Sequence, residues 1–460
     1  MPAVRQRRLV RRGLVAVAAV LVAALFAGTT SVPSLSAKAK APKHIIIMIS
    51  DGWGHNHIDA ASYFRYGRAE GQVYTRFPFQ AAMSTYEVEK PVDNCSPLGY
   101  DPGRAWSDFN YIKYPCATDS ASAATAMSTG VKTYNGYIGV DVNGAPQWHL
   151  MQEAMSKSKA AGVVTSVEFS HATPAGFVAH NISRNNYAAI ANEMLNSGLS
   201  VIMGAGNPEF DDSGIPATKD PKYVGGATTW AALKNPSDGV LDQWTLIQTR
   251  AAFQALATGQ TPARVVGVPQ VYTTLQQARG PADVGQANPF VVPFTPTVPT
   301  LVEMTRAALN VLDNDPDGFV LMVEGGAVDW AGHANQSGRM IEEQIDFDKA
   351  VEAVVAWVQQ NSNWGETLLI VTGDHETGYL TGPMDTISPV WVPVVNGGAG
   401  QLPGMQWNFG EHTNQLIPFF AKGDDGRWFN KSADLTDPVR GPYIDNTDIA
   451  KVIIELLRQR

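Results

Sequence analysis

The chain has 460 residues, of which 44% are hydrophobic and 17% are charged, and its formal net charge is −9. This length and composition indicate a globular protein with one large domain or two ordinary ones. The acidic balance argues against a general nucleic-acid binder, because such proteins present an excess of positive charge to phosphates.

The N-terminus has the pattern of a signal peptide. Five arginines lie in the first 12 residues, and an uncharged, mostly apolar run covers residues 13–28. That run is shorter than the roughly 18 to 20 residues that span a bilayer, and small-residue cleavage sites follow it. We therefore predict a signal peptide over residues 1–39 and a mature protein that is secreted or periplasmic, without a membrane span. The choice between the general and the twin-arginine export route stays open.

Apolar runs and helical patterns alternate along the rest of the chain. Continuous apolar runs, typical of strands buried on both faces, occur at 44–50, 163–168, 201–204, 319–324, 367–372 and 416–421. Helical patterns cover 300–312, about 340–359 and 448–457, the first with Thr300 and Glu303 as a capping box. The alternation predicts an α/β fold, a three-layer sandwich with a large, mostly parallel central sheet and helices on both faces.

Two stretches interrupt this alternation. Residues 207–298 and 383–409 are rich in glycine and proline and show few clear strands. We expect both to be surface insertions in a single catalytic domain that covers residues 40–460.

A run of small residues from Cys116 to Gly130 predicts a short helix. Thr118 or Asp119 can cap its start, and Gly130 can end it. Ser120 then lies in the first turn, where free N–H groups and the helix dipole attract an anion. A hydroxyl in this place could attack a phosphate-sized group. The alternative is a close-packed helix that has a serine at its start.

Cys95 and Cys116 are the only two cysteines. In an exported protein such a pair predicts a disulfide, which would tether the loop that leads into the Ser120 helix. Two free, buried thiols are the alternative.

Acidic side chains and histidines gather at one predicted edge of the sheet. Asp51, Glu324 and Asp374 come at or just after the carboxyl ends of three strands, the edge where such sheets bind ligands. Three carboxylates meeting there would repel one another without a cation. Histidines stand beside carboxylates in the same loops: His333, His375 and His412. Imidazole and carboxylate suit zinc, so the set favours a metal site, although each pair alone could be a surface ion pair.

Six motifs follow one another along the chain: TDSASAATAMSTGVKTYNGYIGVD, HATPAGFVAHNISR, VIMGAGNPEF, VEGGAVDWAGHAN, TGDHETG and EHT. Their order and content resemble the alkaline phosphatase family, from about His44 to the C-terminal helix. The resemblance implies that Ser120 is the nucleophile and forms a covalent phosphoserine. It also implies two zinc ions and one magnesium ion. The first zinc would be held by Asp329, His333 and His412, the second by Asp51, Asp374 and His375, and the magnesium by Asp51, Thr173 and Glu324.

The resemblance also assigns the substrate contacts. Arg184 would hold the phosphoryl group, as catalytic and substrate-binding residue. His171 and Trp330 would neighbour the substrate and the magnesium. Other members carry aspartate at the first of these positions and lysine or histidine at the second, which puts the third metal in doubt.

The activity that the resemblance implies is hydrolysis of phosphate monoesters to alcohol and inorganic phosphate at alkaline pH. The protein could form a homodimer, and we expect no nucleic acid as a specific partner. The alternatives are a phosphodiesterase or sulfatase on the same scaffold, or a non-catalytic phosphate- or metal-binding exoprotein. A sulfatase should carry C/S-x-P-x-R, whereas Ala-Ser-Ala-Ala follows Ser120. A silent protein should lack a ligand or the nucleophile, and none is missing. The physiological substrate stays open.

Overall fold

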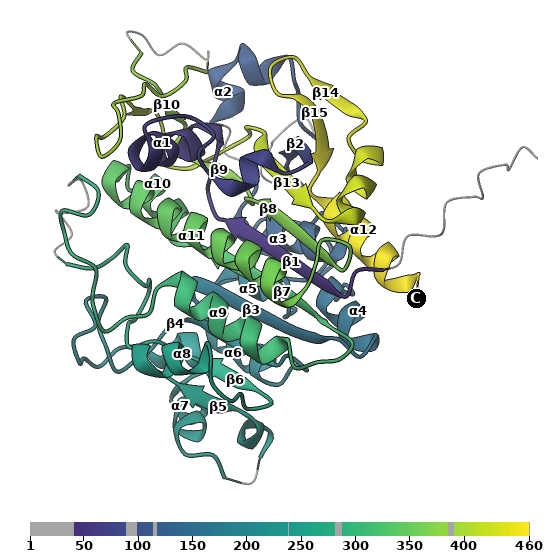
Figure 1. Cartoon of the computed structure of the whole chain (residues 1–460), viewed down its shortest axis with the longest axis vertical. Coiled ribbons are helices and arrows are strands. Elements are labelled where there is room, and N and C mark those ends of the chain that lie inside the picture. The colour runs from purple at the N-terminus through teal and green to yellow at the C-terminus, as the bar shows by residue number, and fades with distance from the viewer. Residues whose placement is uncertain are drawn as a thin grey trace, which may run out of the picture. The chain divides into compact units, whose positions relative to one another are not determined.

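The computed structural model describes residues 41–88, 99–113, 117–237, 239–280, 288–384 and 391–459. Their main feature is an 11-stranded sheet with the order β14-β15-β2-β13-β8-β1-β7-β3-β4-β6-β5 (Figure 1). Its seven strands from β8 to β5 run parallel to one another, and β13 joins them antiparallel. The predicted α/β class with a mostly parallel sheet is confirmed.

The strands at the centre of the sheet are the apolar runs of the sequence. Their bounds are β1 His44–Ser50, β3 Ala160–Glu168, β4 Val201–Ala205, β7 Phe319–Gly325, β8 Thr367–Thr372 and β13 Ile417–Lys422. The outer strands are β2 Phe79–Ser84, β5 Thr245–Ile247, β6 Val265–Gly267, β14 Leu435–Asp437 and β15 Gly441–Asp445. In the register, Ile49 lies opposite Glu324 and also opposite Thr372. The carboxyl ends of β1, β7 and β8 are therefore level, and the residues that follow them meet.

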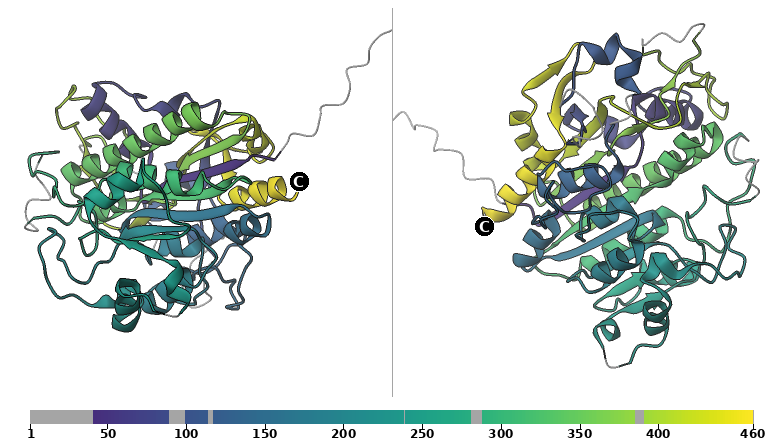
Figure 2. Two further views of the ribbon diagram at one scale, coloured as in Figure 1. Left: turned by 60° about the horizontal axis from the view of Figure 1, so that its bottom comes forward. Right: turned by 180° about the vertical axis from the view of Figure 1, so that it is seen from behind.

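Helices cover both faces of the sheet. One face carries α1 His55–Tyr66, α9 Leu301–Leu312, α10 Ala327–His333 and α11 Ser337–Asn361. The opposite face carries α3 Ser120–Thr129, α4 Leu150–Ser156, α5 Ala172–Gly176 and α12 Thr447–Arg458 (Figure 2, right). The remaining α-helices are α2 Phe109–Ile112, α6 Tyr187–Leu195, α7 Ala227–Lys234 and α8 Arg250–Leu256.

The predicted helix ends agree with the structure. Asp119 is the N-cap of α3, with its carboxylate accepting from the Ser122 N–H at 2.9 Å, and Gly130 ends the helix in the left-handed conformation. Thr300 and Glu303 form the expected capping box of α9. These ends follow from short-range chemistry, which is why the sequence alone predicts them.

Part of the stretch 207–298 does not lie on the surface. It contributes β5 and β6, and β6 pairs with β4, so this stretch extends the central sheet. Three residues each are too few for a clear apolar run, which is why the sequence pattern misses these strands. In the stretch 383–409, β11 Gln406–Trp407 pairs with β10 Leu380–Thr381.

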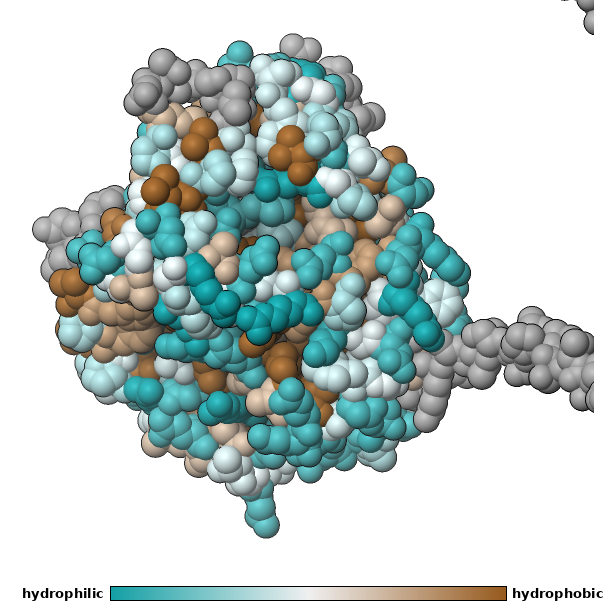
Figure 3. All heavy atoms as spheres, turned by 45° about the horizontal axis from the view of Figure 1, so that its top comes forward, coloured by the Kyte–Doolittle hydropathy of each residue, from teal (hydrophilic) through white to brown (hydrophobic). Residues whose placement is uncertain are grey.

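The predicted signal peptide, 1–39, and both cysteines of the predicted disulfide, Cys95 and Cys116, lie outside the described residues. Within the described ranges, no helix is long and apolar enough to cross a bilayer. Hydrophobic residues are scattered over the mostly hydrophilic face drawn in Figure 3.

The buried acid Glu343 on α11 gives a first testable prediction. Burial, together with the charge of Asp346, raises the pKa of Glu343 from 4.5 to about 8. Between these two values the folded state holds a proton that the unfolded state has lost, so stability falls as the pH rises. We expect Glu343→Gln to match the stability of the wild type at about pH 5 and to raise the free energy of unfolding by about 1–3 kcal/mol relative to the wild type at about pH 9.

Urea unfolding of both proteins at the two pH values measures this difference. Glu366→Gln, at an exposed position, is the matched control and should show no pH-dependent gain. Equal stability of Glu343→Gln and the wild type at both pH values would contradict the assignment of Glu343 as a buried, destabilising acid.

Candidate active site

Three carboxylates meet at the carboxyl ends of the central strands. Asp51 follows β1, Glu324 ends the apolar part of β7, and Asp374 follows β8; all three are fully buried. Both oxygens of Asp51, Oε1 of Glu324 and Oδ2 of Asp374 have no hydrogen-bond partner in the described part of the chain. Buried carboxylate oxygens without a partner are costly, so this cluster needs a cation or protons.

The titration of these acids agrees with that need. Burial and the charge of Asp374 raise the pKa of Asp51 well above its ordinary value. Burial also raises the pKa of Asp374 to about 6 and that of Glu324 to about 7, the latter opposed by the hydroxyls of Thr165 and Thr173. A bound cation would keep all three acids ionised at neutral pH.

Gly52 allows the loops after the strands to approach closely. Its φ is 76°, and a Cβ at this position would lie 2.6 Å from the Cα of Asp329. Its N–H donates to Oδ1 of Asp374 at 3.1 Å. A larger residue would push the Asp51 and Asp329 loops apart.

Ser120 points at His375. Its Oγ lies 3.3 Å from the Nε2 of His375, and the same Nε2 lies 3.4 Å from Asp51 Oδ1 and 3.3 Å from Asp374 Oδ2. In a serine–histidine–aspartate triad the acid binds the opposite ring nitrogen. Here the hydroxyl and both acids converge on one nitrogen, as ligands around a shared cation do. Burial lowers the pKa of His375 well below its ordinary value, so the ring is neutral and can be a ligand.

A second group of possible ligands lies beside the first. His333 Nε2 and His412 Nε2 each lie 3.4 Å from a carboxylate oxygen of Asp329, and 3.1 Å from each other. Their Nδ1 atoms donate to the carbonyls of Gly410 and Thr118, at 2.7 and 2.9 Å. These backbone contacts leave both Nε2 lone pairs facing the site, which is the usual outer support of metal-binding histidines.

The charge of Asp329 favours a cation in this second group. Burial alone would raise the pKa of Asp329, but His333, His412 and His375 outweigh it and hold the pKa well below its ordinary value. Conversely, Asp329 raises the pKa of His412 although burial lowers it. The hydroxyl of Thr377 donates to Asp329 and holds its carboxylate in place.

Three overlapping sets of side chains have ligand atoms close enough to share a metal ion. These sets are Asp329, His375 and His412; Asp51, Asp374 and His375; and Asp51, His171 and Glu324. The second equals one predicted set. The first has His375 where the prediction names His333, which nevertheless faces Asp329 and His412. The third set includes His171, which the resemblance assigns to substrate binding. The Thr173 side chain lies close enough to Glu324 to lower the pKa of its carboxyl group.

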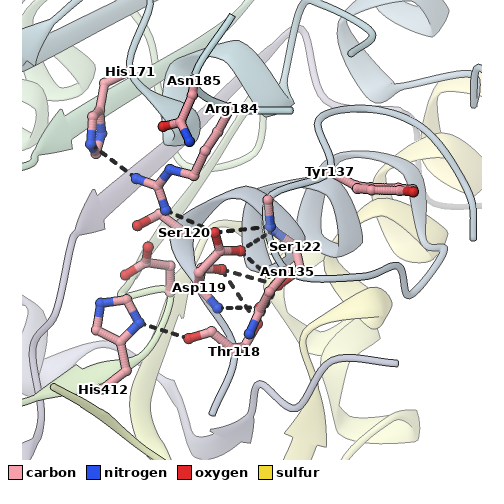
Figure 4. Close-up of polar contacts among 12 residues, drawn as sticks. Thr118, Asp119, Ser120, Ser122, Asn135, Tyr137, His171, Arg184, Asn185 and His412 are labelled. Atoms are coloured by element: carbon pink, nitrogen blue, oxygen red, sulfur yellow. Dashed lines mark hydrogen bonds and ion pairs between the residues drawn. The ribbon is translucent and has the colours of Figure 1, made fainter. Parts of the chain in front are cut away.

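Two side chains, Asp119 and His171, hold the guanidinium of Arg184. Its Nη1 donates to Asp119 Oδ2 at 2.9 Å, and its Nη2 lies 3.1 Å from His171 Nε2 (Figure 4). Asp119 is also the N-cap of α3, so one carboxylate fixes both the start of the Ser120 helix and the orientation of the guanidinium. Burial lowers the pKa of His171 to about 3, so this ring is neutral and accepts from Arg184.

Several of these side chains line one cavity of about 550 Å³. Its lining contains Ser120, His171, Arg184, Gln277, Asp329, Trp330, His333, Ala334 and His412. Seven of the predicted site residues are among these lining residues. The other predicted residues outside the cysteines are fully buried and do not line the cavity: Asp51, Thr173, Glu324, Asp374 and His375. The sequence did not predict the ion pair between Asp119 and Arg184 or the hydrogen bond from Thr377 to Asp329. It also did not predict that Gln277 lines the pocket. Of these, only Asp119 carried a local signal, as a helix cap.

An α/β sheet that gathers acids, histidines, a serine and an arginine at its carboxyl edge is typical of hydrolases that act on phosphate esters with metal ions. The chain belongs to the alkaline phosphatase family, whose sequence profile matches residues 42–417.

Individual members of the family show the same relation. Alkaline phosphatase 3 of Bacillus subtilis is 31% identical over 365 residues, which cover 76% of this chain and 65% of the relative. Alkaline phosphatase H of Pseudomonas aeruginosa is 31% identical over 384 residues, which cover 77% and 73%. The chain thus spans about two thirds to three quarters of the length of these curated relatives.

Solved structures agree in fold. The alkaline phosphatase from the Antarctic bacterium TAB5 superposes with a TM-score of 0.63 at 26% identity, covering 92% of this chain and all of that one. The cold-active enzyme from Shewanella sp. has a TM-score of 0.63 at 26% identity, covering 90% and 99%.

Proposed function

We propose that the protein hydrolyses phosphate monoesters to alcohol and inorganic phosphate, through a covalent phosphoserine on Ser120, with two zinc ions and one magnesium ion. The observation that carries the proposal is the convergence of Ser120 Oγ, Asp51 and Asp374 on the neutral Nε2 of His375. Family membership supports the same reaction.

The side chains fit the metals. Imidazole nitrogens and carboxylate oxygens are zinc ligands, and the oxygens of Asp51, Thr173 and Glu324 suit magnesium. The zinc ions would be held by Asp329, His333 and His412, and by Asp51, Asp374 and His375. The buried carboxylate oxygens without partners support this assignment, and a variant of the TAB5 enzyme is described with Mg bound in its M3 site. Such ions supply Lewis acidity, which favours an alkoxide at a serine hydroxyl and at a leaving oxygen.

The chain's own residues bind and orient the substrate. Arg184 is held by Asp119 and presents its guanidinium to the pocket, where it can hold two phosphoryl oxygens. Ser120 Oγ, at the floor of the pocket, forms a bond to phosphorus and loses its proton to solvent. The P–O bond to the alcohol breaks on the opposite side, toward the mouth, and the departing oxygen takes a proton from solvent. Water then attacks phosphorus from that side, the bond between phosphorus and Ser120 Oγ breaks, the serine hydroxyl regains a proton, and phosphate is released. The free N–H groups at the start of α3 add attraction for the anion.

The remaining features of the proposal come from the sequence. We infer a cleaved signal peptide over residues 1–39, a secreted or periplasmic protein, and a disulfide between Cys95 and Cys116. Small phosphate monoesters are the substrates. Trp330 and His171 contact the substrate pocket, with His171 as a further neighbour of the magnesium.

The monoester preference is tested by Arg184→Lys. A monoester dianion has one more charged oxygen for the guanidinium than a diester has. Lysine cannot reproduce the bidentate contact of arginine with two phosphoryl oxygens. We expect kcat/KM for phenyl phosphate to fall by about 10- to 100-fold and the ratio of monoester to diester hydrolysis to fall with it. Steady-state kinetics on phenyl phosphate, diphenyl phosphate and phenyl sulfate measure both quantities.

Arg68→Lys, at an exposed position, is the control and should keep the wild-type ratio. A wild-type protein that cleaves the diester or the sulfate faster than the monoester would favour the alternative functions. An unchanged ratio in Arg184→Lys would remove Arg184 from substrate recognition.

A further inference from the structure

A short segment of the stretch 207–298 reaches the catalytic pocket. Residues 274–276 are buried, and Gln277, which follows them, lines the pocket. Gln277 is half-buried, whereas Ser120 is only 1% exposed. Gln277 therefore lies nearer the mouth of the pocket than the nucleophile does.

A buried ion pair fixes this segment. Arg279 Nη2 donates to Glu342 Oε2 on α11 at 2.8 Å, and both side chains are 2% exposed. Arg339 donates to the same carboxylate at 2.9 Å. At the other end of the segment, the Leu275 N–H donates to the Ser166 carbonyl at 2.9 Å. Because breaking a buried ion pair is costly, the backbone of Gln277 is held in place.

The carboxamide of Gln277 has one defined neighbour. Its Nε2 donates at 2.9 Å to Oε1 of Gln336, the N-cap residue of α11. Within the described ranges, Gln277 Oε1 accepts no hydrogen bond. Gln277 Oε1 can therefore accept a hydrogen bond from a molecule bound in the pocket.

We propose that Gln277 is a specificity-determining residue, which accepts a hydrogen bond from a hydroxyl on the alcohol part of the substrate. The chemical class favoured is the phosphate monoester of a polyhydroxylated alcohol. This inference rests on the proposed function, because the phosphoryl group must lie at the floor beside Ser120 and Arg184. The alcohol then extends toward the mouth, where Trp330 and Ala334 supply apolar surface and Gln277 supplies the polar contact.

The test compares two substrates on the metal-loaded enzyme. The quantity measured is kcat/KM for glycerol 1-phosphate divided by kcat/KM for phenyl phosphate. Gln277→Met keeps the length of the side chain and removes its hydrogen-bonding groups. We expect this variant to lower the ratio by about 3- to 10-fold, the usual contribution of one neutral hydrogen bond. Gln336→Leu, which frees the carboxamide, should lower the ratio by less.

Gln360→Met, at an exposed position on α11, is the matched control and should keep the wild-type ratio. A ratio for Gln277→Met within about twofold of the wild type, whether both rates fall together or neither falls, overturns the inference. If the wild type hydrolyses phenyl phosphate and Gln277→Met keeps the wild-type ratio, the inference fails and the proposed function stands. A wild-type enzyme that hydrolyses neither ester overturns the proposed function, and the inference with it.

Discussion

We expect Ser120→Ala to lower kcat/KM for phosphate monoesters by about 10⁴-fold, with the fold retained. Ser120 is the only residue with a hydroxyl among the described residues that line the pocket, and its Oγ lies 3.3 Å from His375 Nε2. Alanine removes one oxygen and keeps the helix propensity of α3. Steady-state kinetics on phenyl phosphate measure the loss, and circular dichroism checks the fold.

Ser128→Ala is the matched control, because it removes the same atom from the same helix. Ser128 Oγ donates to the Gly176 carbonyl, away from the pocket lining, so this variant should lose stability and keep its rate. A Ser120→Ala protein that retains a rate similar to that of Ser128→Ala would remove Ser120 from the chemistry.

Removal of metal ions should have the second large effect. We expect a chelator to lower kcat/KM by about 10³-fold or more, and zinc with magnesium to restore it. Without a cation, Asp51, Glu324 and Asp374 are buried beside one another with no compensating charge. The thermal midpoint Tm should therefore fall as well. Because the pKa of Asp374 is raised from 3.8 to about 6 and that of Glu324 from 4.5 to about 7, the metal-free protein should lose stability as the pH rises between these ordinary and raised values.

The same Tm measurement on Ser120→Ala separates stability from activity. This inactive variant should also lose thermal stability on chelation, because its ligands are unchanged. Full activity and an unchanged Tm after exhaustive chelation would contradict a metal-dependent site.

The sequence predicts the parts of the site that depend on short-range patterns. The apolar run that ends at Ser50 places Asp51 at a strand end, and the small residues around Ser120 give α3 with its cap at Asp119. The other contacts of the site join residues that are far apart in the sequence. The Asp119–Arg184 pair joins residues that no local pattern connects. Only the fold shows that Asp119, the cap of α3, also holds the guanidinium of Arg184.

The clearest case of what the sequence could not predict is Gln277. It lies in a stretch rich in glycine and proline that shows no periodicity and is expected to lie on the surface. Its place in the pocket depends on Arg279, which pairs with Glu342 on a helix much later in the chain. Only folding brings those two charges together. The strands β5 and β6 were missed for a related reason, since three residues are too few to establish a pattern.

The central claim is that Ser120 carries the phosphoryl group during turnover, and trapping that group tests it most directly. The metal-loaded enzyme is mixed with a phosphate monoester, quenched in acid, digested and analysed by peptide mass spectrometry. We predict one added phosphoryl group on Ser120 in the wild type and none on that peptide in Ser120→Ala. Turnover with no phosphorylated Ser120 peptide, or with the phosphoryl group on another residue, would contradict the account.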